Sequence, residues 1–314
     1  MDLVTKLDHA MYDGTLLRIF DDQFAALRDG LPLPPTPTPF KAFVEHTNRP
    51  DLREPMLDFW KNTLFAGSKN GRPYFSFPSH IVDPKVSAAV VARTVLPVNA
   101  FAQSAGVTAS IVFQAAYTLL LARLSSSQGR ETDDVDVTYD YLLTGRNVDL
   151  DDPQLINGTC ANFLPFRSPT AGAATAPIQK LLRDTQSAFW AITENGSVSL
   201  GDIYGDAARR KERAAKTLFL FQPFEPPAPA QQDEQRRHMR WIVMAMSKVT
   251  MYVNYAIMFE VFKDREGAHR LKMGYDARLF QTKQIAEGVL NEYLGIVSDM
   301  VEGRKTTVGE FLLG

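Results

Sequence analysis

The chain has 314 residues, of which 45% are hydrophobic and 22% charged, and its formal net charge is −2. This composition is ordinary for a globular protein with one large core or two smaller ones. It lacks the cationic excess that nucleic-acid binding requires, and no apolar run is long enough to cross a bilayer. The first residues, MDLVTKLDHAM, lack the basic start and apolar core of a signal peptide, so we expect a cytoplasmic protein.

Common cofactor motifs are absent from the sequence, which has no GxGxxG, GxxxxGK or GxSxG. The histidines are far apart and show no metal-ligand spacing: His9, His46, His80, His238 and His269. We therefore expect no bound metal and no resident cofactor. The single cysteine, Cys160, excludes an internal disulfide and is expected to be a small buried side chain.

The first elements follow from helical spacing and proline content. Apolar residues recur at helical spacing over 14–27, which predicts a helix. The segment LPLPPTPTPF, 31–40, predicts an extended linker because prolines remove backbone donors and fix φ. A second helix is predicted over 53–65, and the glycines of 67–71 mark its end and a boundary between lobes.

Strands and helices are mixed through the rest of the chain. Alternating or short apolar runs predict strands over 87–95, 135–143, 160–166, 217–221, 250–262 and 270–275. Helical periodicity predicts a buried helix over 108–124 and further helices over 177–193 and 283–301. A loop is predicted over 225–237, and Trp60, Trp190 and Trp241 are expected to be packing residues. The mixture favours an α/β fold of the α+β sandwich kind.

The stretch LDHAMYDG, residues 7–14, holds the strongest candidate for chemistry. A histidine such as His9, near a strand-to-helix turn, can act as a base at neutral pH. If the helix begins near Tyr12, Asp13 lies in its first turn, where the helix dipole favours a carboxylate. Gly14 would allow a close approach or an unusual φ. The alternative is an ordinary helix start beside a hydrogen-bonded histidine.

Several segments resemble one family in the same order along the chain. DHAMYDG, 8–14, resembles the HHxxxDG signature of the condensation domains of nonribosomal peptide synthetases, with Asp8 in place of the first histidine. The further segments that resemble this family, most closely its fungal-type and terminal members, are 40–67, 106–125, 134–150, 156–167, 193–203 and 217–224. Two of them contain the short motifs TGRN, around Arg146, and ANFLPFR, around Asn162.

The resemblance implies a fold of two lobes, each like chloramphenicol acetyltransferase, with a tunnel between them. Carrier proteins bring acyl and amino substrates into this tunnel on phosphopantetheine arms. At its midpoint, His9 would orient the acceptor amine or accept its proton. Asp8 and Asn162 would line the tunnel or contact substrate. The negative charge of Asp8 would raise the pKa of His9 if the two side chains approach each other.

The resemblance also gives the signature a structural part, formed by Asp13, Gly14 and Arg146. Asp13 would pair with Arg146, because a carboxylate and a guanidinium can form a bidentate contact that holds two elements in register. Two alternatives stay open. Arg146 could be an exposed loop arginine, and Asn162 could be a strand-end asparagine that serves a turn.

The position of the signature departs from the family, in which most of the first lobe precedes it. We therefore expect residues 1–70 to be a remnant of the N-terminal lobe and 71–314 to be a C-terminal chloramphenicol-acetyltransferase-like lobe. A partner chain or a second copy would then cover the open surface, or the remnant would repack on the second lobe. The chain could also be a fragment of a larger product.

Three functions are consistent with these observations. The first is a truncated condensation-type enzyme that forms or cyclises an amide or ester bond on a carrier-bound intermediate of secondary metabolism. The second is a tailoring enzyme that performs acyl transfer, cyclisation or isomerisation on a free small molecule. The third is a non-catalytic module that binds a carrier protein or acts as a scaffold. We expect an enzyme of the acyltransferase or condensation type.

Overall fold

The computed structural model describes residues 11–35, 38–64, 81, 83–126, 137–168, 175–205, 216–222, 255–264 and 266–313. The expected helix end at 67–71, the expected loop at 225–237 and Trp241 lie outside these ranges. In the described part of the chain, no single helix is long and apolar enough to span a membrane; one sharply bent helix pair passes that test together by length and composition.

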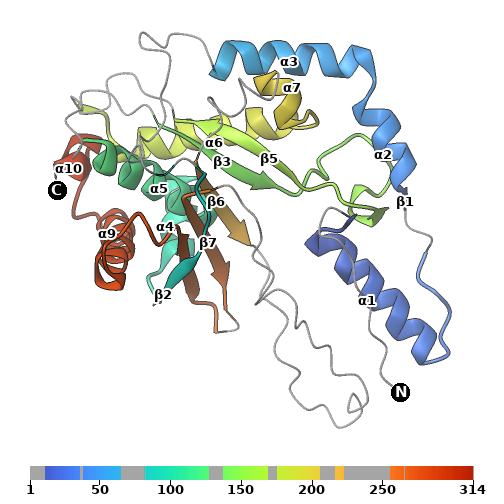
Figure 1. Cartoon of the computed structure of the whole chain (residues 1–314), viewed down its shortest axis with the longest axis horizontal. Helices are drawn as coiled ribbons and strands as arrows, with labels where there is room; N and C mark the ends of the chain where they lie inside the picture. Colours follow the sequence, from blue (N-terminus) through green and yellow to red (C-terminus); the bar gives the residue numbers. More distant parts are fainter. Residues whose placement is uncertain are drawn as a thin grey trace. The chain divides into compact units, whose positions relative to one another are not determined.

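A sheet of six strands lies mostly in the larger of two compact units, which consists of Asn70–Tyr141, Pro165–Phe189 and Ala214–Gly314 (Figure 1). Its strand order is β2-β8-β7-β6-β3-β5, and the bounds are β2 Ala88–Thr94, β3 Thr138–Leu143, β5 Asn162–Arg167, β6 Thr217–Gln222, β7 Ile257–Lys263 and β8 His269–Tyr275. β3, β6 and β7 run parallel, and β8 pairs antiparallel with both β7 and β2. In β7, Ile257, Phe259 and Val261 are buried, as the alternating sequence predicts.

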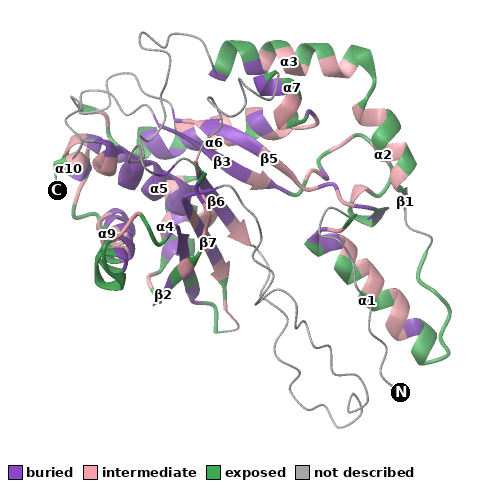
Figure 2. Cartoon of the chain, viewed as in Figure 1, coloured by how far each residue is buried: buried purple, intermediate pink, exposed green. Residues whose placement is uncertain are grey.

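Helices cover this sheet and supply most of its core. Their bounds are α4 Val98–Ala105, α5 Ala109–Ser126, α6 Ile178–Glu194, α9 Lys283–Val301 and α10 Val308–Leu312. α5 contacts β6, and α9 contacts both α5 and β2. Figure 2 shows α5 buried along most of its length, as expected for a helix that is apolar nearly all round. The ring of Tyr117 on α5 packs against Phe219 and Phe259 of the sheet, with ring centroids 5.3 and 5.0 Å away.

The remaining elements belong mostly to a smaller unit. They are α1 Gly14–Arg28, β1 Thr38–Pro39, α2 Phe40–Thr47, α3 Pro50–Leu64, the 3₁₀ turn η2 Pro153–Leu155, β4 Ile156–Asn157 and α7 Leu200–Tyr204. β1 pairs parallel with β4, and the Thr38 hydroxyl donates to the Asp151 carbonyl at 2.9 Å. These contacts join the segment after α1 to the loop that precedes β5.

The chain contacts divide the protein into two compact units. The first consists of Met1–Lys69, Leu142–Leu164 and Trp190–Arg213, and the second of Asn70–Tyr141, Pro165–Phe189 and Ala214–Gly314. The first break falls beside the boundary expected at residue 70. The first unit also contains two later segments, because their residues pack with α1, α2 and α3. The division into lobes 1–70 and 71–314 stays a prediction.

The mixed α/β character is confirmed, and most expected elements are present with shifted ends. The linker prediction is wrong only at its last residue, Phe40, where α2 begins, since Thr38–Pro39 is extended and forms the short strand β1. α3 begins at Pro50, before the predicted 53, because a proline fits the first turn of a helix. Trp60 is buried, as expected of a packing residue, whereas Trp190 is 51% exposed and only partly covered.

Candidate functional site

Asp13 caps the first helix of the smaller unit. Its backbone is extended, and one carboxylate oxygen, Oδ1, accepts the N–H of Leu16 at 2.8 Å. The helix therefore begins at Gly14, as the predicted range 14–27 has it, and Asp13 precedes its first turn instead of lying within it. Asp13 lies one position before the first turn, where a carboxylate satisfies an N–H that has no partner within the helix.

Gly14 is the first helical residue and shows neither feature expected of it. It is exposed, its φ is not positive, and no described atom lies within 4 Å of the position that a Cβ would occupy. The expectation of an unusual φ or a close backbone approach is wrong for the described part of the chain.

Arg146 lies 133 residues beyond Asp13 in sequence and pairs with it inside the protein. The Arg146 side chain is 0% exposed, and its Nη2 donates to both carboxylate oxygens of Asp13 at 3.0 Å. The two expected partners are therefore in contact, and the alternative of an exposed loop arginine is wrong. The geometry differs from the bidentate form, because one nitrogen reaches both oxygens.

The other guanidinium hydrogens bind the loop that contains η2 and β4. Nη1 donates to the carbonyls of Ile156 at 2.9 Å and Pro153 at 3.3 Å, and Nη2 donates to that of Gly158 at 2.8 Å. The Nε–H has no partner among the described residues. Burying a charge is costly unless it is paired and hydrogen-bonded, and here a carboxylate and three carbonyls meet that need. Arg146 thus joins the start of α1 to the 153–158 loop.

Cys160 completes the set of groups around the Asp13 carboxylate. Its backbone N–H donates to Oδ2 of Asp13 at 2.9 Å, and its thiol is buried. Burial raises the pKa of this thiol to about 11, with a smaller increase from Asp13 and a decrease from Arg146. The thiol is therefore protonated at neutral pH, consistent with the expected small buried side chain.

Two glycines that sequence reasoning did not select shape this site. Gly145 has a φ of +66°, and a Cβ there would overlap the carbonyl of Cys160. A Cβ on Gly158 would overlap the ring of Phe40. Both glycines lie in segments that resemble the family, Gly145 in TGRN and Gly158 in 156–167, but no local pattern distinguishes them from surface turn glycines.

A match across nearly the whole chain identifies the family. A model of the condensation domain matches residues 2–312. The chain belongs to the condensation-domain family. Nonribosomal peptide synthetase 7 of Aspergillus fumigatus is 49% identical over 98% of this chain, and nonribosomal peptide synthetase sidE of the same organism is 42% identical over 99%. The chain spans 12% and 14% of the lengths of these two relatives.

Solved condensation domains share the fold. The first condensation domain of the CDA synthetase has a TM-score of 0.64 at 15% identity, covering 96% of this chain and 64% of that structure. The condensation domain of the polyketide synthase MokA has a TM-score of 0.70 at 15% identity, covering 95% and 69%. At these identities the likeness concerns the fold alone, and it confirms the predicted α/β class with its chloramphenicol-acetyltransferase-like lobe.

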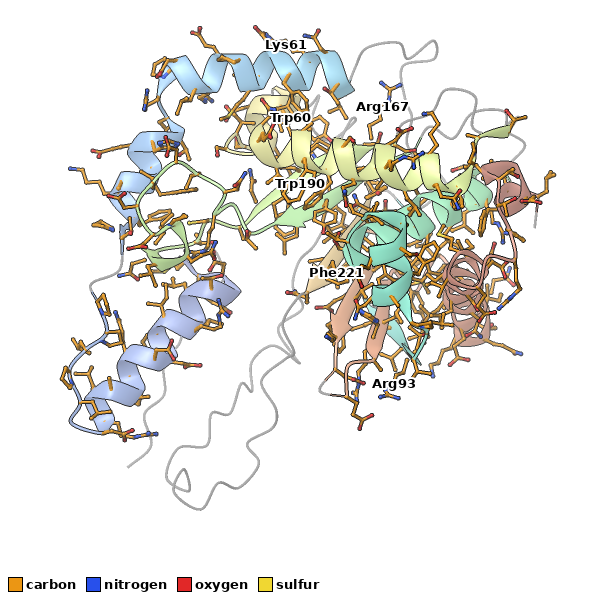
Figure 3. The ribbon with its side chains drawn as sticks, turned by 180° about the vertical axis from the view of Figure 1, so that it is seen from behind. Trp60, Lys61, Arg93, Arg167, Trp190 and Phe221 are labelled. Carbon is orange, nitrogen blue, oxygen red and sulfur yellow. The ribbon has the colours of Figure 1, made fainter. Side chains whose placement is uncertain are left out.

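Within this condensation-family chain, Asn162 serves the loop that follows α6. Its Nδ2 donates to the carbonyls of Gly196 at 2.9 Å and Val198 at 2.7 Å. The same loop is held from α3, where Trp60 donates from Nε1 to the Asn195 carbonyl at 2.8 Å. Figure 3 shows Trp60 and Lys61 on opposite sides of α3. These bonds fit the alternative of a strand-end asparagine that supports a turn, and tunnel lining by Asn162 stays a prediction.

The two residues nearest the expected chemistry, Asp8 and His9, lie outside the described residues. The role of His9 as base or orienting group therefore stays a prediction, and so does contact of Asp8 with substrate. Within the described ranges, no three His, Cys, Asp or Glu side chains gather as a metal site. The described part of the site is thus a structural clasp, made by Asp13, Arg146 and Cys160, that begins four residues after His9.

Proposed function

We propose that this chain is the catalytic part of a condensation-type enzyme that forms or cyclises an amide or ester bond on a carrier-bound intermediate of secondary metabolism. Amide bond formation in peptide biosynthesis is the chemistry of its family. The observation that best supports the proposal is the clasp, a capped helix start with a carboxylate held by a buried arginine, which begins four residues after the signature histidine. Such a rigid support suits a residue that must meet a reacting atom within a few tenths of an ångström.

The proposed step is attack of an amine on a thioester. The nitrogen lone pair forms the new C–N bond, the C–S bond breaks, and the sulfur leaves with the electron pair as the thiolate of the carrier arm. His9 orients the amine and accepts the proton that the nitrogen loses, and that proton then neutralises the thiolate. The carbonyl oxygen carries negative charge during the attack, so hydrogen-bond donors must face it.

A carrier protein with a phosphopantetheine arm is the proposed partner. The arm arrives covalently attached to the carrier and bears the acyl group, so it is part of the substrate and not a resident cofactor. This partner follows from the family, because condensation domains work with carrier domains. A small-molecule nucleophile, or the far end of the same acyl chain, would supply the attacking group.

The test compares His9→Ala with His46→Ala, a substitution at the half-buried histidine of α2. Both variants and the unaltered chain are given an aminoacyl thioester on a phosphopantetheinylated carrier domain together with an amine, and mass spectrometry follows the amide product. The proposal expects product from the unaltered chain and from His46→Ala, and none from His9→Ala with an unchanged circular dichroism spectrum. Equal turnover by a folded His9→Ala variant would show that the proposed step is wrong.

A second arm tests the partner. The same aminoacyl group is supplied as a free N-acetylcysteamine thioester, which carries the end of the arm but no protein. Turnover that needs the carrier supports the proposal, whereas equal turnover of the free thioester favours a tailoring enzyme that acts on a soluble substrate. The expected second copy or partner chain stays a prediction, and light scattering of the purified chain, alone and with the carrier, tests it.

A further inference from the structure

A buried group of polar side chains lies between α5 and the sheet, away from the clasp. Gln114 and Thr118, one turn apart on α5, are 0% exposed, and so is Tyr139 of β3. The hydroxyls of Thr118 and Tyr139 lie 3.1 Å apart and share a hydrogen bond. All three residues belong to the larger unit, so this arrangement does not depend on how the two units are placed.

Of these three residues, Gln114 is the one whose side-chain amide forms no hydrogen bond within the described part of the chain. Neither its amide oxygen nor its amide nitrogen has a hydrogen-bond partner among the described residues. Its side chain is close enough to the Tyr139 hydroxyl to lower the pKa of that group, which burial raises far above the ordinary value. The two groups are therefore neighbours that lack direct hydrogen-bond geometry, and a water molecule can join polar groups that do not bond directly.

The walls around this group are apolar and aromatic. The ring of Tyr117 packs edge-on against Tyr139, with centroids 5.0 Å apart, and Tyr139 stacks on Phe166 at 5.2 Å. Bulk solvent therefore does not reach the Gln114 amide. A buried amide without hydrogen-bond partners destabilises the folded state, so a partner for Gln114 is expected.

We propose that Gln114, Thr118 and Tyr139 bind an internal water molecule that bridges the α5 amide to the β3 hydroxyl. An amide offers a donor and an acceptor, and each hydroxyl offers both, so one water can satisfy the usual two to four bonds here. This water would be a fixed part of the interface between the central helix and the sheet. The inference concerns the fold of the larger unit and is independent of the proposed catalytic step.

The test is oxygen-17 magnetic relaxation dispersion on the purified chain, which detects waters that stay inside a protein longer than it takes to tumble. Gln114→Leu keeps a similar shape without the amide, and Tyr139→Phe removes the hydroxyl alone. Gln103→Leu, at an exposed glutamine of α4, is the matched control. We expect a lower dispersion amplitude in the first two variants and an unchanged amplitude in the control.

An unchanged amplitude in folded Gln114→Leu and Tyr139→Phe would overturn the proposal. If neither variant folds, a high-resolution crystal structure of the unaltered chain decides. Density for a water within hydrogen-bond distance of the Gln114 amide and the Tyr139 oxygen supports it. A direct bond between these two groups, with no density between them, overturns it.

Discussion

Replacement of Asp13 by alanine tests the clasp most directly. The substitution removes both contacts to Arg146, the acceptor for the Cys160 N–H and the cap on the Leu16 N–H. It leaves a guanidinium with a fully buried side chain and no counter-charge among the described residues. The loss therefore combines a broken buried ion pair with a lost helix cap.

The magnitude follows from these two terms. Removing one partner of a buried ion pair typically costs about 3–5 kcal/mol, because the other charge stays buried without compensation. Loss of an aspartate cap costs about 1 kcal/mol in addition. Since domains are stable by about 5–15 kcal/mol, the smaller unit should unfold at a much lower urea concentration. Tryptophan fluorescence can follow this transition because Trp60 is buried in that unit.

Asp29→Ala is the matched control, because Asp29 pairs with Arg28 at the other end of α1. In this pair 36% of the Arg28 side chain and 46% of the Asp29 side chain are exposed. An exposed pair is screened by solvent and contributes little. The urea midpoint of Asp29→Ala should therefore stay close to that of the unaltered chain. Equal midpoints for Asp13→Ala and Asp29→Ala would refute the argument that the buried pair stabilises this unit.

Three further predictions concern single residues. Gly106 has a φ of +69° and open space around it, so Gly106→Ala should cost only the strain of a left-handed residue, roughly 1 kcal/mol. Gly145→Ala should lower the free energy of unfolding by more, because its Cβ would also overlap the Cys160 carbonyl. Urea unfolding of the two variants compares these losses. Cys160 should react with iodoacetamide at pH 8 far more slowly in the folded chain than in urea, because burial raises its pKa to about 11; equal rates would contradict this. Burial, and to a lesser extent Lys263, lowers the pKa of His269 below 6.5, so the folded state binds a proton less readily than the unfolded state. Thermal stability should then fall as the pH drops below about 6.5, and His269→Phe should flatten this dependence between pH 5 and 7.

Long amphipathic elements were predictable because burial of one face decides both their type and their ends. α9 spans 283–301, the predicted range, with a side-chain cap from Thr282 on the Ile285 N–H. Its buried stripe includes Val289, Tyr293, Ile296 and Met300, whereas Ile285 in the first turn is 46% exposed. The helical period of the apolar residues determines this face, and Ile285 lies at its exposed end.

Short elements were missed because their stability comes from contacts that lie far away in sequence. The two residues of β1 are a strand because Thr38 and Pro39 pair with Ile156 and Asn157. α7 is short and is stabilised by its capping box, in which Ser199 and Asp202 bond each other's backbone N–H, and by the ion pair of Arg53 with Asp202. A helix of five residues has too few turns for its apolar period to be read.

At the site, too, the roles of single residues depend on contacts that lie far away in sequence. From LDHAMYDG alone, His9 is the candidate base, Asp13 is expected to be stabilised by the helix dipole, and Gly14 is expected to have a special backbone. In the structure, Asp13 acts through a guanidinium 133 residues away, and the glycine that needs its conformation is Gly145, beside that guanidinium. The pairing could be expected because the family resemblance supplied Arg146 as a partner. The close approach of the Cys160 carbonyl to Gly145 could not, since it follows from the way three separate segments meet around one carboxylate.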